Sequence, residues 1–229
     1  MDGAACRGHL EIVKWLQSID ATGGGCTTSA MDGAATNGRL ETVQWLHNHR
    51  QEGCTTRAMD GAASNGHLEI VEWLHANRSE GCTTKAMDGA ACNNHLDVVQ
   101  WLHANRQEGC TTEAMDKAGS LEVLEWLHEN RSEGCTTEAM DNAAAEGDFP
   151  RMFFLHANRS EGCTETAVYA TGPSEHLEMF LWLNEHYRDV VDAVDVGVFC
   201  HSLSARSSFR QLIDRMRAQS QVKRRRIDL

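Results

Sequence analysis

Cysteine and histidine recur along this chain at fixed intervals, and both can bind a metal ion or act in catalysis as nucleophile and base. One repeated position holds Cys26, Cys54, Cys82, Cys110, Cys135 and Cys163. Another holds His75, His103, His128 and His156. Zinc ligands lie about 2.0–2.3 Å from the ion, whereas neighbouring packed helices lie about 8–10 Å apart. Equivalent residues of successive repeats are therefore too distant to share a metal, and we predict no cofactor.

The same spacing argues against disulfides, whose Cα atoms must usually lie within about 7 Å of each other. Catalysis needs one oriented nucleophile and base, but cysteine, histidine and aspartate recur in most units, so no single set stands apart. The sequence shows neither a phosphate-binding glycine loop nor a nucleophile elbow. We therefore predict buried, reduced thiols and no enzymatic activity, with a thiol- or metal-responsive protein as an alternative.

These residues recur because the chain consists of repeats of about 28 residues, as in the unit at 59–86, MDGAASNGHLEIVEWLHANRSEGCTTKA. Seven starts are found, near residues 1, 31, 59, 87, 115, 140 and 168. A repeat of this length cannot bury its own apolar face, so neighbouring repeats must stack on one another. The sequence predicts a solenoid rather than one compact core.

Each repeat carries two helical signals. Thr83 and Thr84 can cap a first helix over about 84–91, because a threonine hydroxyl accepts a free backbone N–H. Leu68, Val71 and Leu74 recur at helical spacing and predict a second helix over about 67–77. We predict an all-α solenoid of stacked antiparallel helix pairs. One second-helix position is expected to be buried or half-buried and holds Trp15, Trp45, Trp73, Trp101, Trp126, Phe154 and Trp182.

The segment Asn-Gly-His-Leu-Glu-Ile-Val-Glu-Trp-Leu at 65–74 resembles the second helix of an ankyrin repeat, NGHLEVVKLLL. The resemblance covers about residues 1–188 and is weaker in the first helix, where mainly the Ala-Ala pair is retained. The repeat is about five residues shorter than the ankyrin period of about 33. The missing residues fall where ankyrin repeats project a β-hairpin finger. We therefore expect little β structure and short connecting loops, and the resemblance implies a protein-binding function.

The repeats are irregular toward the C-terminus. The fifth lacks three residues, which should shorten its first helix. In the sixth, Asp148 should cap a second helix that has Pro150 in its first turn, and in the seventh Gly172-Pro173 interrupts the first helix. We expect a degenerate capping helix pair at 189–219 and a disordered basic tail at 220–229. The chain starts inside a first helix, so a fragment of a longer array is one hypothesis.

Charge is distributed unevenly along the chain. Residues 1–199 carry 13 Lys and Arg against 31 Asp and Glu, a net charge of −18. This acidic body should repel nucleic acid. No apolar run reaches the length of about 18 residues that a membrane helix needs, and no signal peptide is evident. We expect a cytoplasmic or nuclear protein that is not secreted. The basic run Lys223-Arg224-Arg225-Arg226 resembles a nuclear-localisation signal, with a solvated tail as the alternative.

Two first-helix positions are candidates for contact with a partner. A recurring aspartate can either bond to a neighbouring threonine or line an acidic groove. The position two residues before the methionine varies, and we assign to it Ser29, Arg57, Lys85, Glu113, Glu138 and Glu165. The candidate surface consists of Ser29, Asp32, Arg57, Asp60, Lys85, Asp88, Glu113, Asp116, Glu138 and Asp141. We predict a monomeric scaffold that binds another protein, with a structural or decaying array that has no dedicated partner as the alternative.

Overall fold

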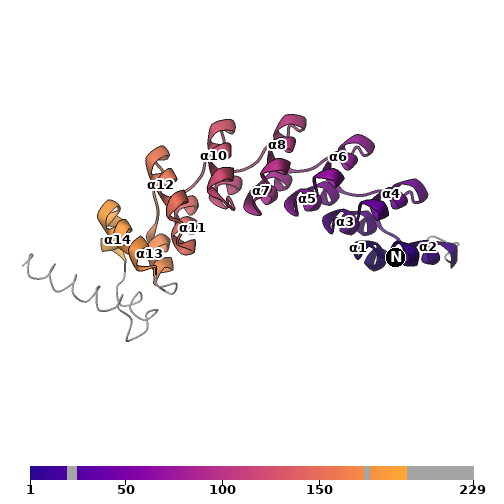
Figure 1. The fold of residues 1–229 in the computed structure, drawn as a ribbon, viewed down its shortest axis with the longest axis horizontal. Coiled ribbons are helices and arrows are strands. Elements are labelled where there is room, and N and C mark those ends of the chain that lie inside the picture. Colours follow the sequence, from indigo (N-terminus) through magenta and orange to yellow (C-terminus); the bar gives the residue numbers. More distant parts are fainter. Residues whose placement is uncertain (20–24, 173–175, 195–229) are drawn as a thin grey trace, which may run out of the picture. The chain divides into compact units, whose positions relative to one another are not determined.

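The computed structural model describes residues 1–19, 25–172 and 176–194, and these residues form helices and connecting segments with no β-strand among them (Figure 1). The predicted all-α repeat fold is therefore confirmed over the described part of the chain. The chain divides into two compact units, Met1–Cys135 and Thr136–Leu229. Each unit is built from helix pairs, in which a first helix is followed by a second.

The first unit contains five such pairs. Their first helices are α1 (Asp2–Cys6), α3 (Thr28–Thr36), α5 (Thr56–Ser64), α7 (Thr84–Cys92) and α9 (Glu113–Asp116). Their second helices are α2 (Leu10–Ile19), α4 (Leu40–His49), α6 (Leu68–Asn77), α8 (Leu96–Asn105) and α10 (Leu121–Asn130). The second unit contains α11 (Glu138–Glu146), α12 (Phe149–Asn158), α13 (Glu165–Thr171), α14 (Leu177–His186) and α15 (Arg188–Ala193).

In the first unit the first helices stack directly on one another in a row, and each second helix packs mainly on its own first helix (Figure 1). The core lies between the two helices of each pair. In the third repeat, Met59, Ala62 and Ala63 of α5 and Val71 and Leu74 of α6 are at most 2% exposed. Alanine at the centre of the first helix leaves room for the neighbouring backbone, so the row can pack closely.

The first helices begin and end as the sequence predicts. Thr83 is the N-cap of α7, and its hydroxyl accepts the N–H of Lys85 at 3.2 Å. After α5 the chain turns at Gly66, whose φ of 73° lies in the left-handed region that favours glycine. The fourth repeat has Asn94 at this place, with a φ of 62°, and asparagine tolerates this conformation better than most residues.

The irregular repeats also follow the expectations. Helix α9 is shortened to four residues, and the Gly119 N–H after it donates to the Ala91 carbonyl of the preceding repeat at 2.9 Å. Asp148 caps α12 by accepting the Arg151 N–H at 3.0 Å, with Pro150 in the first turn. Helix α13 ends at Thr171.

Two predictions about the C-terminal region lie mostly or wholly outside the described residues. Of the capping helix pair expected at 189–219, only residues up to 194 are described, and they include most of α15. The basic tail at 220–229 and its run from Lys223 to Arg226 are not described. These assignments, and the boundaries of the seven repeats, stay predictions.

The shared tryptophan position is half-buried in most repeats but not in the first. The ring of Trp73 contacts His47 of the preceding repeat edge-on, with centroids 5.1 Å apart, and Trp101 contacts His75 in the same way at 5.2 Å. Trp15 is 59% exposed, so the prediction of burial was wrong there. The physical reason is that no preceding repeat in this structure covers the ring of Trp15.

Glycine at the centre of the first helix faces the preceding repeat at very short range. A Cβ added to Gly89 would lie 2.0 Å from Ser64 Oγ and 2.9 Å from Ser64 Cβ, and one added to Gly61 would lie 2.1 Å from Thr36 Oγ1. A Cβ on Gly3 would meet only Arg7, at 4.0 Å. Glycine at positions 61 and 89 is therefore required by the close stacking of helices, whereas Gly3 has space beside it.

Replacement of Gly89 by alanine should destabilise the stack, because rotating the Ser64 hydroxyl away still leaves Ser64 Cβ too close. We expect Gly89→Ala to lower the free energy of unfolding by about 1–3 kcal/mol, as overpacking usually does. The matched control is Gly3→Ala, which should leave stability unchanged or slightly raised, since alanine is the better helix former. Urea denaturation followed by circular dichroism measures both, and an equal effect of the two substitutions would refute the packing argument.

Candidate partner-binding surface

The variable position lies at the start of each first helix and points its side chain to solvent. Ser29, Arg57, Lys85, Glu113 and Glu138 are all exposed. Each donates its backbone N–H to the hydroxyl of the threonine two residues before it, at 3.1–3.2 Å. The backbone contact is the same whatever the side chain, so this position can change its chemistry without changing the fold.

In the seventh repeat the assignment of Glu165 to this position needs a correction. The residue two places after the capping Thr164 is Thr166, whose N–H donates to Thr164 Oγ1 at 3.1 Å. Glu165 is one residue earlier in the helix. The equivalent side chain of the seventh repeat is therefore a neutral threonine rather than a carboxylate.

The recurring aspartates bond to the threonine that caps the next first helix. Asp60 accepts the Thr83 N–H at 2.7 Å and the Thr83 hydroxyl at 2.9 Å. Asp32 does the same with Thr55, and Asp141 with Thr164. Each carboxylate thus joins one repeat to the next.

Burial also separates the aspartates from solvent. Asp32, Asp88, Asp116 and Asp141 are only 4–8% exposed. Burial raises the pKa of Asp88, and the hydrogen bonds that Asp88 accepts from Thr111 act in the opposite direction. The structure therefore buries these four predicted site residues rather than placing them in an open acidic groove. The fifth, Asp60, is half-buried and makes the same threonine contact.

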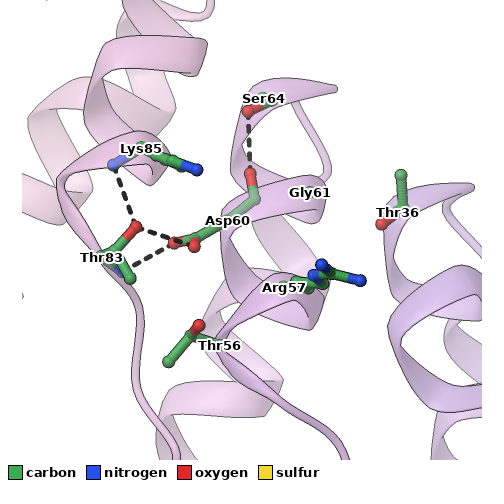
Figure 2. Close-up of a pocket in the computed structure, with 8 residues that line it drawn as sticks. All are labelled: Thr36, Thr56, Arg57, Asp60, Gly61, Ser64, Thr83 and Lys85. Carbon is green, nitrogen blue, oxygen red and sulfur yellow. Dashed lines mark hydrogen bonds between the residues drawn. The ribbon is translucent and has the colours of Figure 1, made fainter. Parts of the chain in front are cut away.

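Side chains of the three neighbouring first helices α3, α5 and α7 line one surface depression (Figure 2). It has a volume of about 420 Å³, which is within the range of small ligand sites. Its lining residues carry hydroxyl and charged groups. The lining residues are Thr36, Thr56, Arg57, Asp60, Gly61, Ser64, Thr83 and Lys85.

The hydroxyls of this depression were not among the sequence-predicted site residues. Thr36 and Ser64 occupy the position after the Ala-Ala pair, and both donate their hydroxyl to the carbonyl four residues earlier, at 2.8 Å. A signal for them exists in the sequence, because this position varies among Cys6, Thr36, Ser64 and Cys92 while the preceding alanines are constant.

The second helices use their histidines for packing between repeats. Arg78 donates through Nη1 toward His47 Nδ1 at 3.5 Å and forms an ion pair with Glu80. The Arg78 guanidinium lowers the pKa of Glu80 to about 2, by hydrogen bonding first and by charge as well. The same arginine–glutamate pair recurs as Arg50–Glu52, Arg106–Glu108, Arg131–Glu133 and Arg159–Glu161. Histidine therefore has a structural role here, beside a tryptophan ring and a guanidinium.

The recurring thiols are shielded and weakly acidic. Cys54, Cys82, Cys110, Cys135 and Cys163 are buried. Burial raises the pKa of Cys82 to about 11 and that of Cys163 to about 12. A thiol must ionise to attack or to bind a metal, so these groups are poor nucleophiles at neutral pH. Within residues 1–19, 25–172 and 176–194, no three His, Cys, Asp or Glu side chains converge to hold a metal ion.

Part of this surface lies in a segment that matches the model of a known repeat family. The family model for ankyrin repeats in many copies matches residues 31–75 and 62–103. This segment contains most of α3, all of α4 to α7 and most of α8, and with them Arg57 and Lys85. No curated protein matches the chain. None of the described helices is long and apolar enough to cross a membrane.

The aspartate–threonine contact should contribute to stability rather than to binding. Asp88→Asn removes the charge and leaves one acceptor for the two donors of Thr111, and we expect the free energy of unfolding to fall by about 1–2 kcal/mol. Lys85→Glu, three residues away, should leave stability nearly unchanged, because its exposed position holds Glu113 in the next repeat. Urea denaturation compares the two variants, and equal stability of Asp88→Asn and the parent chain would contradict this role.

The arginine–glutamate pair predicts a defined acid sensitivity. Because the pKa of Glu80 is lowered from 4.5 to about 2, its stabilising contribution is present above about pH 4.5 and is lost as the pH falls toward 2. Glu80→Gln should therefore lower stability at pH 7 and reduce the further loss between pH 4.5 and pH 2. Thermal unfolding at several pH values measures this, with the exposed Glu69→Gln as control. A parallel acid dependence in Glu80→Gln and the parent would count against the assignment.

Proposed function

We propose that the row of first helices binds another protein and performs no catalysis. The proposal rests on the match of residues 31–103 to the family model for ankyrin repeats. Ankyrin repeats generally mediate interactions between proteins. The proposed partner lies along the starts of the first helices. This region supplies the side chains that differ from repeat to repeat, whereas the β-hairpin finger expected in longer ankyrin repeats is absent from the described residues.

One observation carries the proposal. The variable position, two residues after the capping threonine, is exposed in five successive repeats and holds serine, arginine, lysine and two glutamates. The residues around it are nearly constant and are committed to stacking, as the buried aspartates and alanines show. A constant scaffold that presents a variable exposed row is the arrangement by which repeat proteins create an extended binding surface.

The remaining candidate functions have less support. Buried thiols with a raised pKa argue against a thiol-responsive protein. A purely structural array would not need the variable row to be charged. We also propose a monomer of the cytoplasm or nucleus, a compartment that fits the free cysteines among the described residues.

Site-specific photo-crosslinking in cells tests the proposal. A benzoylphenylalanine residue is placed at Ser29 or Glu113 on first helices, and at Glu72 or Gln100 on second helices; all four positions are exposed. We expect a discrete crosslinked protein from the first-helix positions and none from the second-helix positions, measured by mass spectrometry. Crosslinks only from Glu72 and Gln100, or from none of the four, would rule out the proposed surface.

A further inference from the structure

Arg57 and Lys85 are the two basic residues of the first unit that lie beside one depression. Neither makes an ion pair with any described residue, and both are exposed. Most other basic side chains of this unit are paired with a glutamate, namely Lys14, Arg50, Arg78, Arg106, Lys117 and Arg131. Two unpaired cations beside one depression are an anion-attracting feature in a chain segment that is otherwise strongly acidic.

The local charge balance at the depression is positive. Three charged side chains line it: Arg57, Lys85 and Asp60. The carboxylate of Asp60 already accepts two hydrogen bonds from Thr83, at 2.7 and 2.9 Å, as Figure 2 shows. Arg57 and Lys85 make no such contact through their charged groups. An incoming carboxylate therefore meets two available cations and one carboxylate that is engaged with its own repeat.

The spacing of the two cations sets the spacing of the groups that they can bind. Arg57 and Lys85 hold the same position in α5 and α7, which stack directly on each other. Equivalent positions on neighbouring packed helices are about 8–10 Å apart. A segment in the extended polyproline II conformation advances about 3.1 Å per residue and has three residues per turn, so side chains three residues apart lie on the same side, about 9 Å from each other.

The residue at the equivalent position of the next repeat limits how many acidic side chains the row of first helices can bind. Glu113 occupies the equivalent position of α9, and it forms an ion pair with Lys117 of the same helix. A third acidic residue at the same interval would approach Glu113 and be repelled. On the other side, Ser29 is neutral. The charges of these first-helix positions therefore favour a partner segment with two acidic residues. A neutral residue would flank them at one end and a neutral or basic residue at the other.

We propose that Arg57 and Lys85 bind a segment of a partner protein in the extended polyproline II conformation that carries two acidic side chains three residues apart. This inference rests on the proposed function and narrows it to a chemical pattern. The partner segment runs along the row of first helices, and each acidic side chain pairs with one cation. The hydroxyls of Thr36 and Ser64 lie in the same depression and donate within their own helices, so their oxygens can accept a hydrogen bond from a backbone N–H of the intervening residues.

Three fluorescein-labelled peptides test the spacing directly, in titrations of the full chain followed by fluorescence anisotropy. The first has two glutamates separated by two residues in a glycine–serine background. The second has the same composition with adjacent glutamates, and the third has glutamine in place of both. We expect the first peptide to bind roughly tenfold more tightly than the second, the factor that one additional charged contact supplies. It should bind more tightly still than the third.

Charge-reversal variants identify the residues responsible. The double variant Arg57→Glu, Lys85→Glu should remove the preference for the spaced peptide, while Arg39→Glu, which reverses an exposed arginine outside the depression, should keep it. The reversed chain should fold, because glutamate is native to this position in α9 and α11 and an acidic residue suits the first turn of a helix. The double variant also controls for weak attraction of any acidic peptide to the basic residues at 200–229.

Equal affinity for the spaced and adjacent peptides, or an unchanged preference in the double variant, would overturn the inference. Either result leaves the proposed function standing if the crosslinks still come from Ser29 and Glu113. Loss of those first-helix crosslinks, with the peptide preference intact, would instead remove the proposed function and leave an acidic-peptide site.

Discussion

The stack depends on one contact, the carboxylate of an aspartate bonded to the threonine that caps the next first helix. A first helix of nine residues has few hydrogen bonds of its own and leaves its first backbone N–H groups without partners. Thr83 satisfies one of these groups in α7, and Asp60 of the preceding repeat holds Thr83 in place through two bonds. Helix initiation in one repeat is thus tied to the position of the repeat before it. Close packing at Gly61 and Gly89 fits the same arrangement, because it needs successive first helices to stay in a fixed register.

The two helices of each repeat make different contacts, and the histidine and cysteine side chains of the repeats are engaged in packing. On the second helices, histidine contacts a tryptophan ring and an arginine, and that arginine is paired with a glutamate two residues later. The neighbouring cysteine is buried beneath this pair, and its raised pKa keeps it protonated. Metal-binding and nucleophilic residue types are therefore distributed one per repeat in structural roles.

Much of this architecture can be predicted from the sequence because repetition turns local signals into global ones. The threonine cap, the apolar spacing of Leu68, Val71 and Leu74, and the three-residue deletion before α10 each have a local meaning, and the structure agrees with all of them. Contacts across repeats were harder to predict. Spacing alone left two roles open for the aspartates, since a carboxylate near a threonine can bond to it or face solvent. The prediction that Trp15 is buried was wrong for the same reason, because the environment of a residue depends on the neighbouring repeat as well as on its own helix. The depression between Arg57 and Lys85 combines side chains from three helices, and no single repeat contains that information.

The first-helix position whose side chain varies most between repeats is also the position where substitution should reduce stability least. The backbone N–H of Arg57 is satisfied by the Thr55 hydroxyl at 3.2 Å, and the side chain points to solvent. Substitution there leaves the cap, the aspartate contact and the helix packing unchanged, so charge can differ from repeat to repeat without strain. In the second helices the opposite holds, because replacing Arg78 would disturb a histidine, a glutamate and a cysteine together. Selection for a partner can therefore act on the row of first helices almost independently of stability. This separation is the physical reason for placing recognition on that row.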